Sequence, residues 1–175
     1  MRTILPVYIG IDNGTTGSIG VIKGDKSKFF LPPIYREQSY TKHEAYINRV
    51  DPFILCERLK KITKNASAVF ILIERPVTGM QVKTMASGMR ALEATLIGIK
   101  MAGLEINAYL DSREWQKVML PGIKGSDKLK AASRKVGCKL FPEHRELIKR
   151  TNTKDRDTGD ADGLLMAEYC RRRFK

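Results

Sequence analysis

The sequence predicts an α/β domain with a mixed central sheet, an N-terminal antiparallel hairpin and flanking helices. Two short apolar runs, over residues 7–11 and 18–22, lie on either side of a glycine-rich turn, which predicts the hairpin. An unbroken apolar run over residues 68–73 is typical of a strand that is covered on both faces. Segments with helical spacing of apolar residues lie between and after these strands, and this order joins the later strands by helical crossovers.

The N-terminal half is expected to hold the hairpin, a third strand and one helix. The first strand ends at Asp12, and residues 28–31 predict a third strand that two prolines close. Residues 34–50 are polar and carry three tyrosines, so we interpret them as a loop whose helical content is left open. Asp51 before Pro52 is typical of an N-cap followed by proline at the first helical position, and it predicts a helix there.

The C-terminal half alternates helices with a strand. The apolar spacing predicts a long helix over residues 85–99, which is either part of the core or a dimer seam. The other expected elements are a strand over 106–110, short helices near 112–118 and 126–136, and a C-terminal helix from residue 162. The predicted order is the hairpin strands, a helix, a strand, a helix, a strand and then helices. The RNase H-like fold has this order.

Length and composition limit the class of protein. The 175 residues, with a mass of 19.8 kDa, suit one domain, and we expect a single domain over residues 1–175. Apolar residues make up 42% and charged residues 29%, which excludes a disordered or fibrous chain. The net charge of +13 favours a polyanionic partner, either nucleic acid or an acidic membrane surface. No apolar run approaches the roughly 20 residues that span a bilayer, so no membrane is expected.

Cysteine and histidine usage limits the metal chemistry. The three cysteines, Cys56, Cys138 and Cys170, are far apart, no CxxC motif occurs and only two histidines are present. A zinc site is therefore not expected, and the thiols are predicted to be reduced and partly buried. Any bound metal must then have oxygen ligands. The first apolar stretch is too short for a secretion signal, so we expect a cytoplasmic location in a bacterium or a phage-infected cell.

Acidic residues end two of the predicted central strands. Asp12 follows the first apolar run, and Glu74 follows the run over residues 68–73. In open α/β sheets ligands collect beyond the strand ends, and a carboxylate after an apolar run is costly without a counter-charge. Either residue alone is equally an ordinary polar strand end, but the pair predicts a functional site.

A third acidic cluster precedes the C-terminal helix. Four carboxylates fall within eight residues, at Asp155, Asp157, Asp160 and Asp162, and they repel one another unless a cation is near. Asp162 shares a helical stripe with Leu165, so its side chain is expected to point towards the sheet. One interpretation is an acidic helix start that interacts with the helix dipole. The other is a Mg²⁺ site, because Mg²⁺ prefers carboxylates and water.

Asp12, Glu74, Asp162 and one more aspartate of the cluster are a candidate set of ligands for two Mg²⁺ ions. Two such ions activate a water and stabilise the leaving oxygen in phosphodiester hydrolysis. A positively charged protein with a local acidic pocket fits this chemistry, because its surface attracts the polyanion while its acids hold the metals.

Short motifs along the chain resemble those of the RuvC-like Holliday junction resolvases of the RNase H-like superfamily. The matching segments are Gly10-Ile11-Asp12 with Gly14 and Gly17-Ser18, Ile73-Glu74, and Ala161-Asp162-Gly163-Leu164-Leu165-Met166-Ala167. Bacterial RuvC typically places its last two acids three residues apart, whereas here Gly159 stands three before Asp162 and Asp157 stands five before it. This spacing, with Trp115-Gln116-Lys117 and Leu140-Phe141-Pro142, is more similar to the phage and chloroplast branch.

This resemblance implies a Mg²⁺-dependent crossover junction endodeoxyribonuclease that acts in DNA recombination and repair. Such enzymes are homodimers that bind a four-way DNA junction and nick two strands symmetrically, using Mg²⁺ or Mn²⁺. The implied catalytic and metal-binding residues are Asp12, Glu74, Asp157 and Asp162, with Asp155 and Asp160 as alternatives to Asp157. A lysine near the scissile phosphate is also implied, and Lys128 and Lys130 both stand where it is expected.

The excess positive charge is concentrated between residues 117 and 154. This stretch holds eleven Lys and Arg residues against three acids. It is either an ordinary solvated face or a phosphate-binding surface, and phosphate contacts imply strong salt dependence. The cations expected to contact DNA are Lys117, Lys124, Lys128, Lys130, Arg134 and Lys135.

Three other functions are compatible with the sequence. A nuclease of the same fold can act on other branched DNA or on RNA–DNA hybrids. Residues 10–17 also resemble the phosphate loop of sugar kinases and heat-shock ATPases, but those proteins place a nucleotide between two such domains, and this length supplies about one. The third is a DNA-binding protein without catalysis, which the retained acids argue against.

Overall fold

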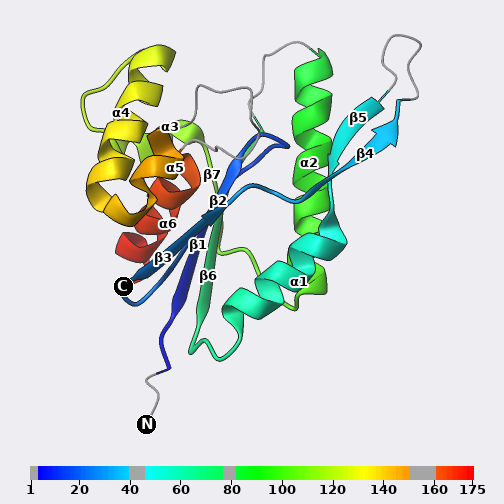
Figure 1. Ribbon diagram of the computed structural model, residues 1–175, viewed down its shortest axis with the longest axis horizontal. Coiled ribbons are helices and arrows are strands. Elements are labelled where there is room, and N and C mark those ends of the chain that lie inside the picture. Colours follow the sequence, from blue (N-terminus) through cyan, green and yellow to red (C-terminus); the bar gives the residue numbers. More distant parts are fainter. Residues whose placement is uncertain (1–3, 40–45, 77–81, 150–160) are drawn as a thin grey trace.

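The structure is a computed structural model that describes residues 4–39, 46–76, 82–149 and 161–175. It has an RNase H-like α/β fold with a five-stranded sheet, in the order β3-β2-β1-β6-β7, and a two-stranded sheet of β4 and β5 (Figure 1). The strands are β1 (Val7–Asp12), β2 (Ser18–Lys23), β3 (Lys26–Phe30), β4 (Ile34–Gln38), β5 (Tyr46–Val50), β6 (Val69–Glu74) and β7 (Ala108–Leu110). The helices are α1 (Pro52–Thr63), α2 (Val82–Met101), α3 (Ser112–Met119), α4 (Ser126–Leu140), η1 (Pro142–His144), α5 (Arg145–Lys149) and α6 (Asp162–Arg173).

The central sheet is mixed, as the sequence predicts. β1 pairs antiparallel with β2, and β2 with β3, which confirms the N-terminal hairpin and its third strand. β1 and β6 run parallel, as do β6 and β7, and α2 is the crossover between the last two. Because β1 and β6 are parallel neighbours, they end at the same edge of the sheet.

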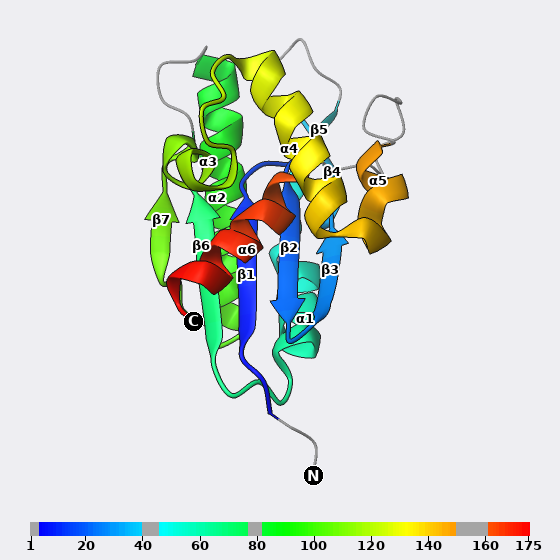
Figure 2. The ribbon, with the colours of Figure 1, turned by 90° about the vertical axis from the view of Figure 1, so that its left-hand side faces the viewer.

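Helices cover both faces of this sheet (Figure 1, Figure 2). On one face, α1 and α2 pack against alternate residues of β1, including Ile9 and Ile11. On the other face, α6 lies across β1 and β2, and α3 and α4 pack beside it. Coverage on both faces explains why the central strands are unbroken apolar runs rather than alternating ones.

Glycines let α6 pack directly on the backbone of β1 and β2. A Cβ atom at Gly10 would lie 2.2 Å from the Ala167 nitrogen, and one at Gly20 would lie 2.3 Å from the Gly163 oxygen. A Cβ atom at Gly163 would lie 2.7 Å from the Ser18 oxygen. No side chain fits in these places, so the first turn of α6 is held against the start of β2.

This close packing predicts an unequal response of two glycines to the same substitution. Gly20→Ala is expected to lower the free energy of unfolding by about 3 kcal/mol, because the new methyl group overlaps the backbone of Gly163. Gly88→Ala, in α2, is the matched control, because its Cβ would meet only the Pro76 side chain, at 3.4 Å. Alanine is also the better helix former, so this control is expected to be at least as stable as the native protein. Urea unfolding measures both, and equal stabilities would contradict the packing of α6.

The structure differs from the prediction at residues 34–38 and 46–50, which form β4 and β5 rather than parts of a loop. The two strands pair antiparallel over their whole length, and the Arg49 guanidinium donates to a carboxylate oxygen of Glu37 at 2.6 Å across the pair. Most side chains of both strands are exposed or half-buried. A ribbon with no fully buried face lacks the apolar alternation from which strands are predicted.

The helices confirm most of the prediction and extend it. Asp51 caps α1 as expected, because its Oδ1 accepts hydrogen bonds from the backbone nitrogens of Phe53 and Ile54, at 2.9 and 3.0 Å. α4 continues to Leu140, beyond the expected end at residue 136, and η1 and α5 follow where the sequence predicts no element. Within the described ranges, no helix has both the length and the apolar character needed to cross a bilayer.

The long helix α2 contributes to the core on one face and exposes apolar side chains on the other. Ala91 and Ile99 are buried in the core, which confirms that interpretation for one face. Val82, Met89 and Met101 are 77%, 52% and 43% exposed. A dimer seam on this second face stays a prediction.

The three cysteines are free thiols, as predicted. Cys56 and Cys170 are buried, and Cys138 is half-buried. Burial raises the pKa of the Cys170 thiol to about 12, so this thiol stays protonated and unreactive at neutral pH.

Candidate active site

Asp12 and Glu74 lie side by side at one edge of the central sheet. Each is the last residue of its strand, and the parallel register of β1 and β6 pairs Ile11 with Ile73. The next position along both strands places Asp12 beside Glu74. Both residues are half-buried. The structure therefore brings together the two acids that the sequence puts at strand ends.

Asp162, the first residue of α6, is carried to the same edge. The backbone nitrogen of Gly163 donates a hydrogen bond to Ser18 Oγ at 3.0 Å, and Ser18 is the residue of β2 that pairs with Asp12. The preceding residue, Asp162, thus lies near the end of β1. Its Oδ1 accepts a hydrogen bond from the hydroxyl of Ser133 in α4. The backbone at the start of α6 thus meets the sheet, while the Asp162 carboxylate contacts α4; its expected orientation towards the sheet stays a prediction.

Glu74 is held by two donors from α3. The Ser112 hydroxyl donates to Glu74 Oε1, and the Trp115 indole nitrogen donates to Glu74 Oε2 at 2.8 Å. Trp115 is only 1% exposed, so its ring is packed in the core. Its second role is to orient the carboxylate, because each oxygen of Glu74 has its own donor.

Sequence reasoning missed these supporting residues, although two signals pointed to them. A buried indole N–H requires an acceptor, so a buried tryptophan in a chain with candidate acidic sites is a candidate donor. Ser112 and Trp115 are three residues apart, and this spacing puts both on one face of a helix. Ser133, which contacts Asp162, carries no such signal.

The remaining candidate ligands, Asp155, Asp157 and Asp160, lie outside the described residues. The described part of the chain contains no group of three Asp, Glu, His or Cys side chains placed to hold one metal ion. Asp12, Glu74 and Asp162 all lie within the described residues, so these three on their own do not form such a group. We call the end of the sheet that carries them the acidic edge, and its expected fourth member lies outside the described residues.

The donor chemistry of the acidic edge fits a hard divalent cation. Carboxylate oxygens are the ligands that Mg²⁺ prefers. The neighbouring Asn13 donates from its amide nitrogen to the Gly88 carbonyl at 3.1 Å. Its amide oxygen is buried and has no hydrogen-bond partner within the described structure. A buried acceptor of this kind is satisfied by a water or a cation, which agrees with a polar ligand beside Asp12.

The cations expected to contact DNA lie on α3, on α4 and on the loop between these helices. Lys117 is in α3, Lys124 is in the following loop, and Lys128, Lys130, Arg134 and Lys135 are in α4. All are exposed except the half-buried Arg134. We call these cations the α3–α4 surface; the two helices that carry most of them also contact Glu74, through Ser112 and Trp115, and Asp162, through Ser133.

The arginines at the end of α6 are engaged within the fold. Arg171 and Arg172 donate to the buried Glu168, at 2.7 and 2.8 Å. Burial alone would raise the pKa of Glu168, but these hydrogen bonds and positive charges lower it below its ordinary value. Glu168 is thus ionised at neutral pH and fixes both guanidinium groups.

Comparison with known proteins shows similarity of fold. No protein-family model matches the sequence, and no curated protein matches it. Among solved structures, the chain is similar to RuvC of T. thermophilus in complex with a Holliday junction substrate, with a TM-score of 0.51 and 12% identity. The alignment covers 98% of this chain and 97% of that one. A second structure of Thermus thermophilus RuvC has a TM-score of 0.45 and 15% identity, and covers 92% and 90% of the two chains. The first comparison confirms the predicted RuvC-like, RNase H-like fold.

Proposed function

We propose that the protein is a structure-selective endodeoxyribonuclease that resolves four-way DNA junctions with paired, symmetric nicks. The observation that carries this proposal is the placement of Asp12 and Glu74 side by side at the ends of parallel strands, with the start of α6, where Asp162 stands, hydrogen-bonded to Ser18 of the neighbouring strand. The choice of substrate is supported by the fold shared with RuvC, whose solved complex contains a Holliday junction substrate. The cations of the α3–α4 surface also favour a polyanion.

Asp12, Glu74, Asp162 and Asp157 are proposed to hold two Mg²⁺ ions, or Mn²⁺ in their place. All four offer the carboxylate oxygens that hard divalent cations prefer. Such ions, when bound, supply a water of lowered pKa and a counter-charge for the departing 3′ oxygen.

Hydrogen bonds within the chain keep two of these carboxylates oriented. Ser112 and Trp115 engage both oxygens of Glu74, and Ser133 engages Oδ1 of Asp162. A carboxylate oxygen that accepts one hydrogen bond keeps a second lone pair, so these contacts are compatible with metal binding. They reduce the reorganisation that the acids would undergo when substrate binds.

We further propose Lys130, rather than Lys128, as the lysine at the scissile phosphate. Ser133 of α4 contacts Asp162, and Lys130 precedes Ser133 by three residues, about 60° around the helix. Lys128 precedes Ser133 by five residues, about 140° around the helix. Lys130 is therefore closer to the side of α4 that meets the acidic edge.

This assignment predicts different effects for two neighbouring lysines. Lys130→Ala is expected to slow junction cleavage about tenfold, because it removes a cation beside the reacting phosphate. Lys128→Ala is expected to weaken binding and its salt dependence while changing the single-turnover rate by about twofold at most. Single-turnover cleavage at saturating protein separates the two effects, and the opposite ranking would assign the role to Lys128.

The choice of Asp157 as fourth ligand is tested within its own cluster. Asp157→Asn is expected to slow single-turnover cleavage about tenfold more than Asp160→Asn, because only the first removes a metal ligand. Both substitutions remove one negative charge from the same segment, so the second controls for the change in charge. The reverse order would assign the ligand to Asp160.

The same proposal includes a homodimer of single-domain subunits. Two symmetric nicks require two sites related by a two-fold axis, and a two-fold interface uses one surface of each subunit. The exposed apolar side chains of α2, Val82, Met89 and Met101, make that helix the candidate seam. The motif at residues 115–117 and the five-residue spacing of the last two acids favour the phage and chloroplast branch of these enzymes. The proposal also includes a cytoplasmic location, in a bacterium or in a phage-infected cell.

A substrate panel tests the proposed function. Purified protein is incubated with a four-way junction, a duplex, a Y-fork and an RNA–DNA hybrid of matched sequence, with Mg²⁺ or with EDTA. We expect cutting of the junction alone, and only with Mg²⁺. Preferential cutting of the fork or the hybrid would replace the substrate with that one, and junction binding without cutting of any substrate would favour a binding protein.

A further inference from the structure

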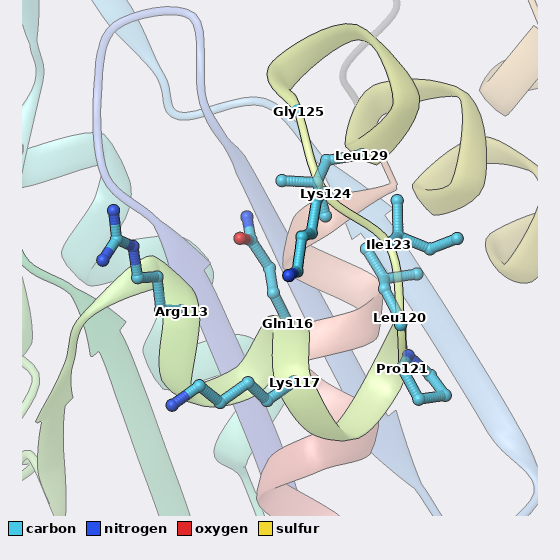
Figure 3. Close-up of a pocket in the computed structure, with 10 residues that line it drawn as sticks. Arg113, Gln116, Lys117, Leu120, Pro121, Ile123, Lys124, Gly125 and Leu129 are labelled. Atoms are coloured by element: carbon cyan, nitrogen blue, oxygen red, sulfur yellow. The ribbon is translucent and has the colours of Figure 1, made fainter.

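A pocket next to the acidic edge combines cations with apolar side chains (Figure 3). It has a volume of about 550 Å³ and lies between α3, the loop over residues 120–125 and the start of α4. Arg113 and Lys117 of α3 and Lys124 of the loop line it, and the described residues that line it include no acid. The pocket is therefore suited to an anionic ligand.

The rest of the lining is apolar, with one amide. Ile123 and Leu129 supply aliphatic surface, with the buried Leu120 beneath them, and Ile123 is 40% exposed. Gln116 lies among them, and Figure 3 shows its amide and the Lys124 ammonium between the helix and the loop. The aliphatic surface would not stabilise a bound free phosphate, and the three cations would not stabilise a wholly apolar ligand. The lining is therefore suited to a ligand that has both an anionic and an apolar part.

Glycines determine the shape of the loop that carries Ile123 and Lys124. Gly122 and Gly125 have φ angles of +76° and +92°, a conformation that other residues rarely adopt. The conformation of the loop that carries Ile123 and Lys124 thus depends on glycine at positions 122 and 125.

The pocket lies on a different face of α3 from the one that contacts Glu74. Ser112 and Trp115 point their donors at Glu74. Arg113 follows the first of them, Gln116 and Lys117 follow the second, and all three line the pocket. The same short helix therefore contacts one of the proposed catalytic carboxylates on one face and lines the pocket on another.

We propose that this pocket receives one unpaired nucleotide of the DNA substrate, which rests on the proposed function and extends it. The base would lie on Ile123 and Leu129, because the faces of a base are apolar. Its polar edge would meet Gln116, whose amide both donates and accepts hydrogen bonds. The adjoining phosphates would meet the cations.

The nucleotide must be unpaired, because a base within a duplex has both faces covered by its neighbours. Extruding a base costs least where pairing is already disturbed, as it is at a branch point. The pocket would thus favour junctions over plain duplex, in addition to any preference that comes from the backbone shape.

Fluorescence of 2-aminopurine tests this inference without cleavage. Asp12→Asn protein with Mg²⁺ is mixed with four-way junctions that carry the probe at successive positions around the branch point. We expect a rise at one position next to the expected cut, because the base leaves its stack, and no rise with a matched duplex. Ile123→Ala and Gln116→Ala are expected to remove that rise and to weaken junction binding about fivefold. Val118→Ala is the matched control, because Val118 is an exposed aliphatic residue of α3 outside the pocket.

The outcomes separate this inference from the function on which it rests. If the native protein cuts the junction, but no position responds or the response survives Ile123→Ala and Gln116→Ala, the pocket does not hold the base and the nuclease assignment stands. If the native protein neither binds nor cuts any branched substrate, both are overturned. If Ile123→Ala changes the sedimentation of the protein without DNA, a second copy of the chain occupies the pocket, which also overturns the inference.

Discussion

Asp12→Asn is expected to abolish junction cleavage while junction binding is kept or strengthened. Asp12 ends β1 beside Glu74, and its carboxylate is one of the proposed ligands for Mg²⁺. The amide keeps the size of the side chain but lacks the charge that a Mg²⁺ ligand needs. We expect a rate lower by about 10³-fold or more, as for removal of a central catalytic group in other enzymes.

Binding is expected to respond in the opposite direction, because the substitution removes a negative charge near the bound phosphate. Single-turnover cleavage and a gel-shift titration measure the two properties on the same junction. Asp25→Asn is the matched control, since Asp25 is exposed in the turn between β2 and β3, at the opposite end of β2 from Ser18. Loss of binding in parallel with cleavage would contradict a catalytic role for Asp12.

Trp115→Phe is expected to slow cleavage roughly 10- to 100-fold with little change in junction affinity. The phenyl ring keeps most of the buried volume but removes the N–H that donates to Glu74 Oε2 at 2.8 Å. Glu74 then loses one of the two donors that orient it. A decrease of about 10- to 100-fold is the usual effect of removing a residue that positions a metal ligand. Trp115 is a positioning residue, so the Mg²⁺ concentration for half-maximal rate is expected to rise as well.

Tyr109→Phe provides the comparison for this prediction. Tyr109 is an exposed aromatic residue of β7, the strand next to Glu74, and the change likewise removes one polar hydrogen from an aromatic ring. It is expected to leave the rate and the Mg²⁺ dependence unchanged. Circular dichroism checks that both variants are folded. A Trp115→Phe protein with native rate and native Mg²⁺ dependence would show that the indole only fills space.

The parts of the fold that the sequence predicts are those encoded by local patterns. The hairpin, the strand that ends at Glu74 and the cap at Asp51 each depend on residues close together in the chain, so their signals are read directly. The ribbon of β4 and β5 was missed because neither of its faces is fully buried, so it lacks the alternation of a half-buried sheet.

The acids of the site were predictable, but their support was not. Asp12 and Glu74 are recognisable because a carboxylate at the end of an apolar strand stands out. The donors to Glu74 come from residues 38 and 41 positions further along the chain, and the contact of Ser133 with Asp162 spans 29 positions. Such pairings depend on how helices pack on the sheet, which no local pattern records.

Mapping the cuts on all four strands of a synthetic four-way junction tests the central claim most directly. Each strand is labelled in turn, and the products of native and Asp12→Asn protein are compared with Mg²⁺ and with EDTA. We predict two nicks at symmetric positions on opposite strands, absent in EDTA and in the Asp12→Asn protein. An uncut junction, or cuts that persist in Asp12→Asn protein, would contradict the assignment of the acidic edge as the catalytic centre.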